Sequence, residues 1–137
     1  MANYFAQART NYFKVKDPEA FIAHMNHYNV TVIARTLESG ESLYGFIDDN
    51  ADGAGLDWSS WDERTDEETD IPWVPILASH LAEGHVAIVM EVGWEAYRWL
   101  NGYAFAVNHL GEAVEVNLMD IYERAKTLGP HIREVGD

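Results

Sequence analysis

The sequence contains no cysteine, and this absence removes several kinds of chemistry at once. A chain without thiols has no disulfide, no thiolate metal site and no cysteine nucleophile, and it fits a reducing cytosol. Long apolar runs are also missing, since the longest, Val86 to Met90, is far too short to cross a bilayer. The first ten residues, MANYFAQART, have no long apolar core and no basic leader, so we expect no signal peptide.

Basic residues are scarce, because 9 Lys and Arg stand against 23 Asp and Glu and give a net charge of −14. A charge of this size repels nucleic acid and anionic membranes, and it accelerates the encounter with basic surfaces. We therefore expect no direct nucleic acid binding and no membrane association. Solubility alone explains the total charge equally well, so the informative feature is how the charge is distributed.

Most of the excess charge lies in one stretch, Asp48 to Asp70, DDNADGAGLDWSSWDERTDEETD. This stretch holds ten acidic residues and one base, Arg64, which amounts to nine of the 14 net negative charges. Gly53 and Gly55 lie close together and no sustained periodicity is present, so we predict a long loop that can hold one short helical turn near 59–64. A loop of this length in a compact domain is usually functional or mobile.

The segments on both sides have ordinary α/β patterning. Alternating aromatic and β-branched residues predict strands at 4–16, 30–35, 43–47, 85–92, 97–108 and 113–117. Capping signals predict helices that begin at Asp17-Pro18-Glu19, within 71–83 and after Asn117. The order β-α-β-β, acidic loop, α-β-β-β-α predicts a single α+β domain over 1–137. Its mostly antiparallel sheet would have helices packed on it, and residues 48–70 would be an acidic insertion.

Several side chains can be assigned to the interior or to the surface from these patterns. The last helix has Ile121, Tyr122, Ala125 and Leu128 at helical spacing, which predicts a buried stripe. Glu91 lies in the strongest predicted strand, and we expect it to face solvent. The sequence supplies no nucleophile with a partner base and no glycine-rich phosphate loop, so we predict no enzyme and no catalytic residue.

Residues 48–53 match the first half of a calcium-binding loop. Asp48, Asn50 and Asp52 would place oxygen ligands at positions one, three and five. The second half does not match, because position twelve is Ser59 instead of a bidentate glutamate. We favour an acidic surface turn and predict no metal or cofactor. The alternative is a calcium- or ligand-binding accessory domain that uses these three residues.

The histidines offer a second possible metal site. His24 and His27 lie three apart on a predicted helix, and His80 and His85 straddle the end of another. No carboxylate near them in the sequence completes a known ligand pattern. We assign structural or surface roles to all four.

Five tryptophans are many for 137 residues. We place Trp99 in the core, whereas Trp58 and Trp61 lie three apart in a polar context and are expected to be exposed. Exposed aromatic rings among carboxylates suit docking onto a basic protein surface, because the rings stack on Arg or Lys and the acids steer the approach. The predicted partner-binding residues are Asp57, Trp58, Trp61, Asp62, Glu63, Asp66, Glu67, Glu68 and Asp70.

Three segments outside the acidic stretch carry a family resemblance. They are ARTNYFKVKDPEA at 8–20, HLAEGHVAIVMEVGWEAYRWLNGYAFAVN at 80–108 and VNLMDIYERAKTLGP at 116–130. With these segments the chain resembles a group of small, poorly characterised bacterial proteins found on phages, plasmids and other mobile elements. The resemblance covers most of the chain, its motifs are structural, and it transfers no active site.

Mobile elements often carry small acidic inhibitors of host defence, including anti-CRISPR and antirestriction proteins that imitate the charge of DNA. By this analogy of setting and charge, the resemblance implies an inhibitor of a bacterial defence system in the host cytoplasm. Such an inhibitor would block the basic nucleic-acid-binding surface of a protein such as a defence nuclease complex. The sequence leaves the oligomeric state open.

Overall fold

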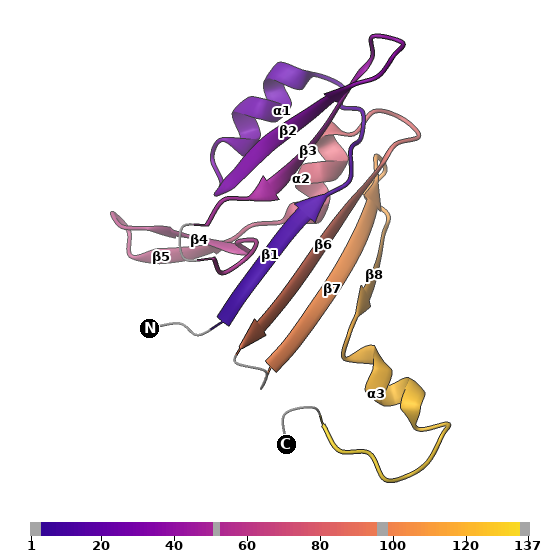
Figure 1. Ribbon diagram of the computed structural model, residues 1–137. Coiled ribbons are helices and arrows are strands. Elements are labelled where there is room, and N and C mark those ends of the chain that lie inside the picture. The colour runs from indigo at the N-terminus through magenta and orange to yellow at the C-terminus, as the bar shows by residue number, and fades with distance from the viewer. Residues whose placement is uncertain (1–3, 51–52, 96–98, 135–137) are drawn as a thin grey trace.

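The computed structural model describes residues 4–50, 53–95 and 99–134 (Figure 1). Its strands are β1 (Tyr4–Thr10), β2 (Val30–Thr36), β3 (Ser42–Asp48), β4 (Ser59–Asp62), β5 (Glu67–Asp70), β6 (Val86–Glu95), β7 (Trp99–Asn108) and β8 (Ala113–Asn117). Its helices are α1 (Pro18–Met25), α2 (Trp73–His80) and α3 (Asp120–Ala125). None of these helices has the length and apolar character needed to span a bilayer.

Six strands form one antiparallel sheet in the order β2-β3-β1-β6-β7-β8. The N-terminal strand β1 therefore lies in the middle of the sheet, where it pairs along its whole length with β6. Strands β4 and β5 form a separate two-stranded sheet. The predicted α+β class is confirmed, as is the predicted order of elements outside the acidic stretch.

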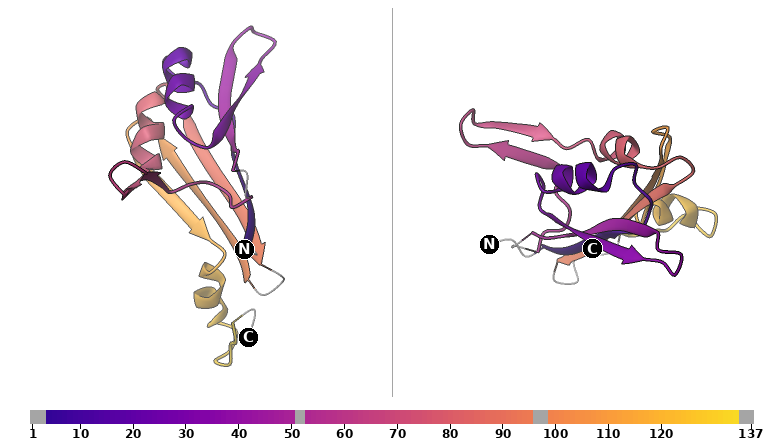
Figure 2. Two further views of the ribbon diagram at one scale, coloured as in Figure 1. Left: turned by 90° about the vertical axis from the view of Figure 1, so that its left-hand side faces the viewer. Right: turned by 90° about the horizontal axis from the view of Figure 1, so that it is seen from above.

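Helices α1 and α2 cover the same face of the sheet, and no helix of the described residues lies over the opposite face (Figure 2). Asp17 caps α1, because its Oδ1 accepts hydrogen bonds from the backbone N–H groups of Glu19 and Ala20 at 3.1 and 3.3 Å. Phe21 and Met25 lie one turn apart on this helix and are fully buried. The local cap and the apolar spacing thus place α1 as the sequence predicts.

The core between these helices and the sheet is built around Trp73 of α2. Its ring centroid lies 5.4 Å from that of Phe46 and 5.0 Å from that of Tyr28. The prediction that Trp99 is a core residue is wrong, since Trp99 is exposed. Along β7 the core extends only to Tyr103, so Trp99 lies beyond the part of the strand that the core reaches.

The predicted acidic loop is wrong for its second half. Residues 59–62 and 67–70 pair as an antiparallel hairpin, with no helical turn near 59–64. A hairpin satisfies the backbone hydrogen bonds of these residues locally, even though acidic residues are otherwise rare in strands. Before the hairpin, the described residues 49–50 and 53–58 form a loop, as predicted.

The last helix also differs from its prediction. The predicted cap at Asn117 is wrong, because the N-cap position of α3 is Met119 and no side chain caps it. In the turn before the helix, the Asn117 N–H donates to Asp120 Oδ2 at 3.0 Å and the Met119 N–H donates to Asn117 Oδ1 at 2.9 Å. The predicted buried stripe is absent as well, and no residue of α3 is buried. The helix follows the edge strand β8 and extends away from the sheet (Figure 1), so it does not pack on the face that α1 and α2 cover.

Candidate functional site

Strands β4 and β5 form a hairpin that projects from the body of the molecule (Figures 1 and 2). Trp61 pairs with Glu68 and Asp62 with Glu67 across the two strands. The turn closes through Asp66, whose N–H donates to the Asp62 carbonyl at 2.8 Å. The φ of Asp66 is 58°, a left-handed conformation that Asp tolerates better than most residues. We call residues 59–70 the acidic hairpin.

The acidic hairpin concentrates carboxylates that its single base does not neutralise. Its acidic residues are Asp62, Glu63, Asp66, Glu67, Glu68 and Asp70. Arg64 Nε lies 3.8 Å from Asp62 Oδ1, and the guanidinium is almost fully exposed, so water screens this pair. Because side chains alternate between the two faces of a strand, both faces of the hairpin carry negative charge.

Trp61 is the exposed aromatic residue of the acidic hairpin, with 58% of its surface accessible. It lies directly across from Glu68, whose Oε1 accepts a hydrogen bond of 2.6 Å from the Ser59 hydroxyl. This bond restricts the carboxylate beside the ring. The pair presents an apolar surface and a negative charge side by side, as the sequence predicts for a docking anchor.

Trp58 precedes the hairpin and has a different environment from Trp61. Its indole N–H donates to the Tyr103 hydroxyl at 2.8 Å, and its ring packs edge-on against Tyr103 and Phe105 at centroid distances of 5.9 and 5.6 Å. Although 44% of Trp58 is exposed, its polar atom and part of its ring contact β7. In this structure Trp58 fixes the base of the hairpin to the sheet.

Asp57 is likewise engaged within the fold. Its carboxylate accepts hydrogen bonds from the side-chain amides of Asn29 and Asn50 at 2.8 and 3.0 Å, and its backbone carbonyl accepts one from the Trp73 indole at 2.7 Å. Of the nine predicted partner-binding residues, the structure gathers seven on the acidic hairpin and places Asp57 and Trp58 at its base.

Glu91 is the buried acid beneath this base, and the prediction that it faces solvent is wrong. Only 7% of its surface is exposed. Its Oε1 accepts a 2.7 Å hydrogen bond from the Leu56 N–H, and its carboxyl also hydrogen-bonds the Tyr103 hydroxyl. Burial raises the pKa of Glu91, and the nearby charge of Asp48 adds to this, while the Leu56 bond opposes it. Glu91 therefore holds the loop before the hairpin against the sheet.

The sequence gives only a weak indication that Glu91 is buried. Period-two alternation places position 91 on the same side of β6 as Ala87 and Val89, which are both buried. This places the acid on the inner face, but its bonding partners come from a loop and from another strand. Those contacts are not local, and pattern reading does not supply them.

The predicted calcium ligands have partners within the protein. Asp48 Oδ1 accepts a 2.7 Å hydrogen bond from the Ala8 N–H, and the Asn50 amide donates to the Gly55 carbonyl and to Asp57. The third predicted ligand, Asp52, lies outside the described residues. Over the described ranges no group of three or more His, Asp or Glu side chains has a metal-binding arrangement. No observation favours the calcium alternative over the surface turn.

The histidines form contacts within the fold. His24 Nδ1 lies 2.7 Å from His80 Nε2, so α1 and α2 meet through this pair. Burial lowers the pKa of His80, and the neighbouring His24 and Lys16 lower it further. His85 Nδ1 accepts a 3.2 Å hydrogen bond from the Lys14 N–H. These contacts are of the structural kind that we assigned to them.

Comparison of the chain with protein-family models, with curated proteins and with solved structures finds no match in any of the three. The resemblance to proteins of mobile elements therefore stays a prediction, and the site has to be interpreted from its own geometry.

Proposed function

We propose that this chain is a non-enzymatic acidic binding protein whose acidic hairpin occupies a nucleic-acid-binding surface of another protein. The observation that carries the proposal is the projection of β4 and β5 from the body of the molecule (Figure 2), with six carboxylates and the exposed Trp61 on them. A projecting element can enter a cleft that a flat acidic surface cannot enter.

The charge density of the acidic hairpin supports the mimicry of nucleic acid. Six acids and one base give it a net charge of −5. Four-residue strands with their turn span roughly 14 to 17 Å, at about 3.4 Å per residue. This amounts to about one net charge per 3 Å, which is close to the spacing of roughly 3.4 Å per phosphate along one DNA strand. Lys and Arg side chains that hold phosphates would therefore meet carboxylates at a similar density.

Trp61 supplies the part of the binding energy that charge alone does not. A tryptophan buries a large apolar area and stacks on the guanidinium of Arg, the residue most used in phosphate recognition. Its position opposite Glu68 allows one Arg of the partner to stack on the ring and pair with the carboxylate. Trp61 is thus the candidate hot spot of the interface.

The proposed partner is a defence nuclease complex of a bacterial host, met in the cytoplasm by an inhibitor from a phage, plasmid or other mobile element. This setting comes from the resemblance of the segments that flank the hairpin. The binding mode comes from the hairpin itself, and the two parts are tested by different readouts of one experiment.

The experiment is affinity capture from a bacterial host lysate at low and high salt, followed by identification of the retained proteins. The hairpin variant carries Asp62→Asn, Glu63→Gln, Asp66→Asn, Glu67→Gln and Glu68→Gln. We expect the wild type to retain a nucleic-acid-binding protein at low salt and to release it at high salt, because charge pairs at an exposed interface are screened. We expect the variant to lose this protein. The identity of the captured protein tests the setting.

A control variant removes the same number of negative charges elsewhere on the surface. Its substitutions to Gln are at Glu19, Glu38, Glu83, Glu123 and Glu134, which are all exposed. Because both variants have the same net charge, only the location of the charge differs. We expect the control to bind like the wild type. Undiminished capture by a hairpin variant that melts like the wild type would show that the hairpin is not the binding element.

A further inference from the structure

None of the described helices lies over the face of the main sheet opposite α1 and α2 (Figure 2). The exposed side chains of this face are largely apolar. We call it the outer face, and it consists of alternate residues 5–9 of β1, 86–94 of β6, 100–108 of β7 and 114–116 of β8. Met90 and Val92, at its centre, are 57% and 60% exposed. Neighbouring strands add further exposed apolar side chains, so the patch is continuous. Continuous apolar patches of this kind mark interaction sites.

The outer face also lacks the charge that dominates the rest of the chain. No Asp or Glu occurs among its residues, and its single charged side chain is Arg9. The whole chain holds 23 acidic residues and has a net charge of −14. Two copies of such a chain repel each other in most orientations, but across this face no carboxylate would oppose another. A basic partner, in contrast, is attracted to the acidic hairpin and not here.

The relief of the outer face is self-complementary. Large side chains of β6 lie beside small ones of β7, since Met90 pairs with Ala104 and Val92 with Gly102. The β6 side chains form a ridge, and the β7 residues form a trough that is open beside Ala104. At Gly102 the Leu118 side chain lies over the trough, since a Cβ there would lie 3.0 Å from Leu118 Cδ1. A hollow of about 280 Å³ follows this trough, with Val116 of β8 on its far side.

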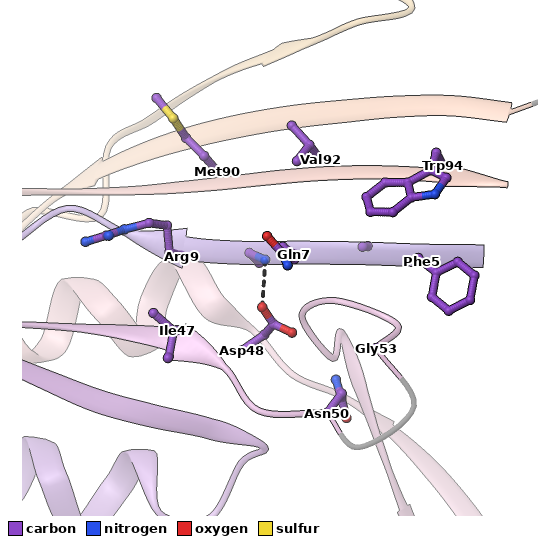
Figure 3. A pocket seen from close by; sticks show the side chains of 12 residues that line it. Phe5, Gln7, Arg9, Ile47, Asp48, Asn50, Gly53, Met90, Val92 and Trp94 are labelled. Carbon is purple, nitrogen blue, oxygen red and sulfur yellow. Dashed lines mark hydrogen bonds between the residues drawn. The ribbon is translucent and has the colours of Figure 1, made fainter. Parts of the chain in front are cut away.

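A second hollow, of about 660 Å³, lies on the other side of the ridge (Figure 3). There Met90, Val92 and Trp94 project from β6, and Phe5 lies beside Trp94 with a ring-centroid distance of 6.1 Å. Asp48 borders this hollow on the side of β3, where its carboxylate is held by the Ala8 N–H. The β6 ridge therefore stands between two depressions.

We infer that a second copy of this chain covers the outer face, with the β6 ridge of each copy in the β7 trough of the other. The two-fold axis runs parallel to the strands, between β6 and β7 and between the two sheets. It places the β6 ridge of each copy over the β7 trough of the other, because the two strands are neighbours in the sheet. The two sheets then pack face to face as in a β-sandwich, in which the inner side chains of the two layers interdigitate.

The size of the outer face suits a stable dimer. The four strands contain 7, 10, 10 and 5 residues. At about 3.3 Å per residue and about 4.8 Å between strands, they give a plan area of roughly 500 Å². A standard interface buries about 800 Å² of accessible surface on each partner. Since side chains make the accessible surface larger than its plan projection, the face is large enough to supply this area.

The first test is sedimentation equilibrium of the full chain over a range of micromolar concentrations. We expect a mass of twice 15.5 kDa for the wild type. The Val92→Glu variant should sediment as a monomer, since it places a charge on the ridge, and its exposed position leaves the fold of the single copy intact. Leu110→Glu is the matched control, because Leu110 is an exposed apolar residue in the turn after β7 and outside the outer face. This variant should remain a dimer.

A charge-pair experiment tests the ridge-in-trough contact itself. Ala104→Lys, in the trough, should also give a monomer when alone. Mixing it with Met90→Glu, which alone should likewise be a monomer, should restore a heterodimer. Met90 pairs with Ala104 across the two strands, so the two-fold axis places the new Glu of one copy opposite the new Lys of the other, while the second contact keeps its native residues. Dimerisation through any other surface would not produce this rescue.

Either of two results would overturn the inference. One is a wild type that remains a monomer throughout the concentration range, and the other is a Val92→Glu variant that dimerises like the wild type. The hairpin variant described above should remain a dimer, because its substitutions lie outside the outer face. The dimer and the proposed function can therefore fail independently.

Discussion

The indole N–H of Trp58 donates a 2.8 Å hydrogen bond to the hydroxyl of Tyr103, which in turn hydrogen-bonds the carboxyl of Glu91. This chain of polar groups joins the base of the acidic hairpin to β7 and β6. Tyr103 and Glu91 are both largely withdrawn from water, and burial raises the pKa of each. Buried polar chains are strong when every group is satisfied and weak when one is removed.

Replacing Tyr103 by Phe should therefore destabilise the protein. The change removes one hydroxyl and leaves the Trp58 N–H and the Glu91 carboxyl each without a partner that they have in the native fold. We expect a loss of about 1–2 kcal/mol in the free energy of unfolding, measured by urea denaturation. Tyr12→Phe is a control for loss of a hydroxyl away from the network, because Tyr12 lies after the end of β1 and its contact with Arg9 is made through the ring. An unchanged urea midpoint for Tyr103→Phe would mean that the hydrogen bonds of Tyr103 make no net contribution to the free energy of unfolding.

The Glu91→Gln variant should change how stability depends on pH. The pKa of Glu91 is raised above 4.5 in the folded state. The folded protein therefore binds the proton of the Glu91 carboxyl more tightly than the unfolded chain does. The contribution of Glu91 to stability is complete below pH 4.5 and is lost as the pH rises through the folded pKa. The amide does not ionise, so the variant should gain stability relative to the wild type between about pH 4 and about pH 8. Urea unfolding of both proteins across this range measures the difference, and a constant difference would contradict the prediction.

Gly55 and Gly111 form a matched pair for testing the contact beneath the hairpin. Both have a φ of +84°, but a Cβ on Gly55 would collide with the Glu91 carboxylate and with Ala6, whereas one on Gly111 would meet nothing within 4 Å. Gly111→Ala should cost about 1 kcal/mol from the left-handed backbone alone. Gly55→Ala should lower the free energy of unfolding by at least about 2 kcal/mol more than Gly111→Ala does, because the added Cβ collides with the buried side chains of Glu91 and Ala6. Equal losses in thermal unfolding would show that the loop moves away without penalty.

The His80→Gln variant tests the contact between α1 and α2. The pKa of His80 is lowered below 6.5, so its contribution to stability is present above pH 6.5 and is lost as the pH falls through the folded pKa. The wild type should therefore lose more stability than the variant on acidification from about pH 8 to about pH 5. The exposed His131, changed to Gln, controls for loss of an imidazole. Parallel stability curves for His80→Gln and the wild type would disprove the effect.

Local signals in the sequence predict much of the fold. The cap at Asp17, the buried positions Phe21 and Met25, and the alternation that turns Tyr103 and Phe105 inward all depend on residues within a few positions of one another. The prediction fails for the last helix, where apolar spacing was assumed to imply a packing surface. Spacing predicts which side chains share a helix face, but it does not show whether another element lies opposite.

The candidate site is predictable in composition but not in shape. The charge and the exposed Trp61 can be read directly from the sequence, whereas the hairpin depends on cross-strand pairs such as Trp61 with Glu68 in a segment whose acidic residues disfavour strands. Trp58 and Asp57 are indistinguishable from the hairpin residues by composition. Their roles follow from Tyr103 and Asn29, which are distant in the sequence.

The central position of β1 has a consequence for how the protein is made. This strand is made before the other strands of the sheet, yet its partners in β6 lie about 80 to 90 positions later in the chain. The sheet cannot close during synthesis until most of the chain has emerged, and contacts of such high sequence separation slow folding. Deleting the first ten residues would not trim an edge but would divide the sheet between β3 and β6. The nascent chain can pair one edge of β1 with β3, but the edge that faces β6 has to stay unpaired until β6 has emerged.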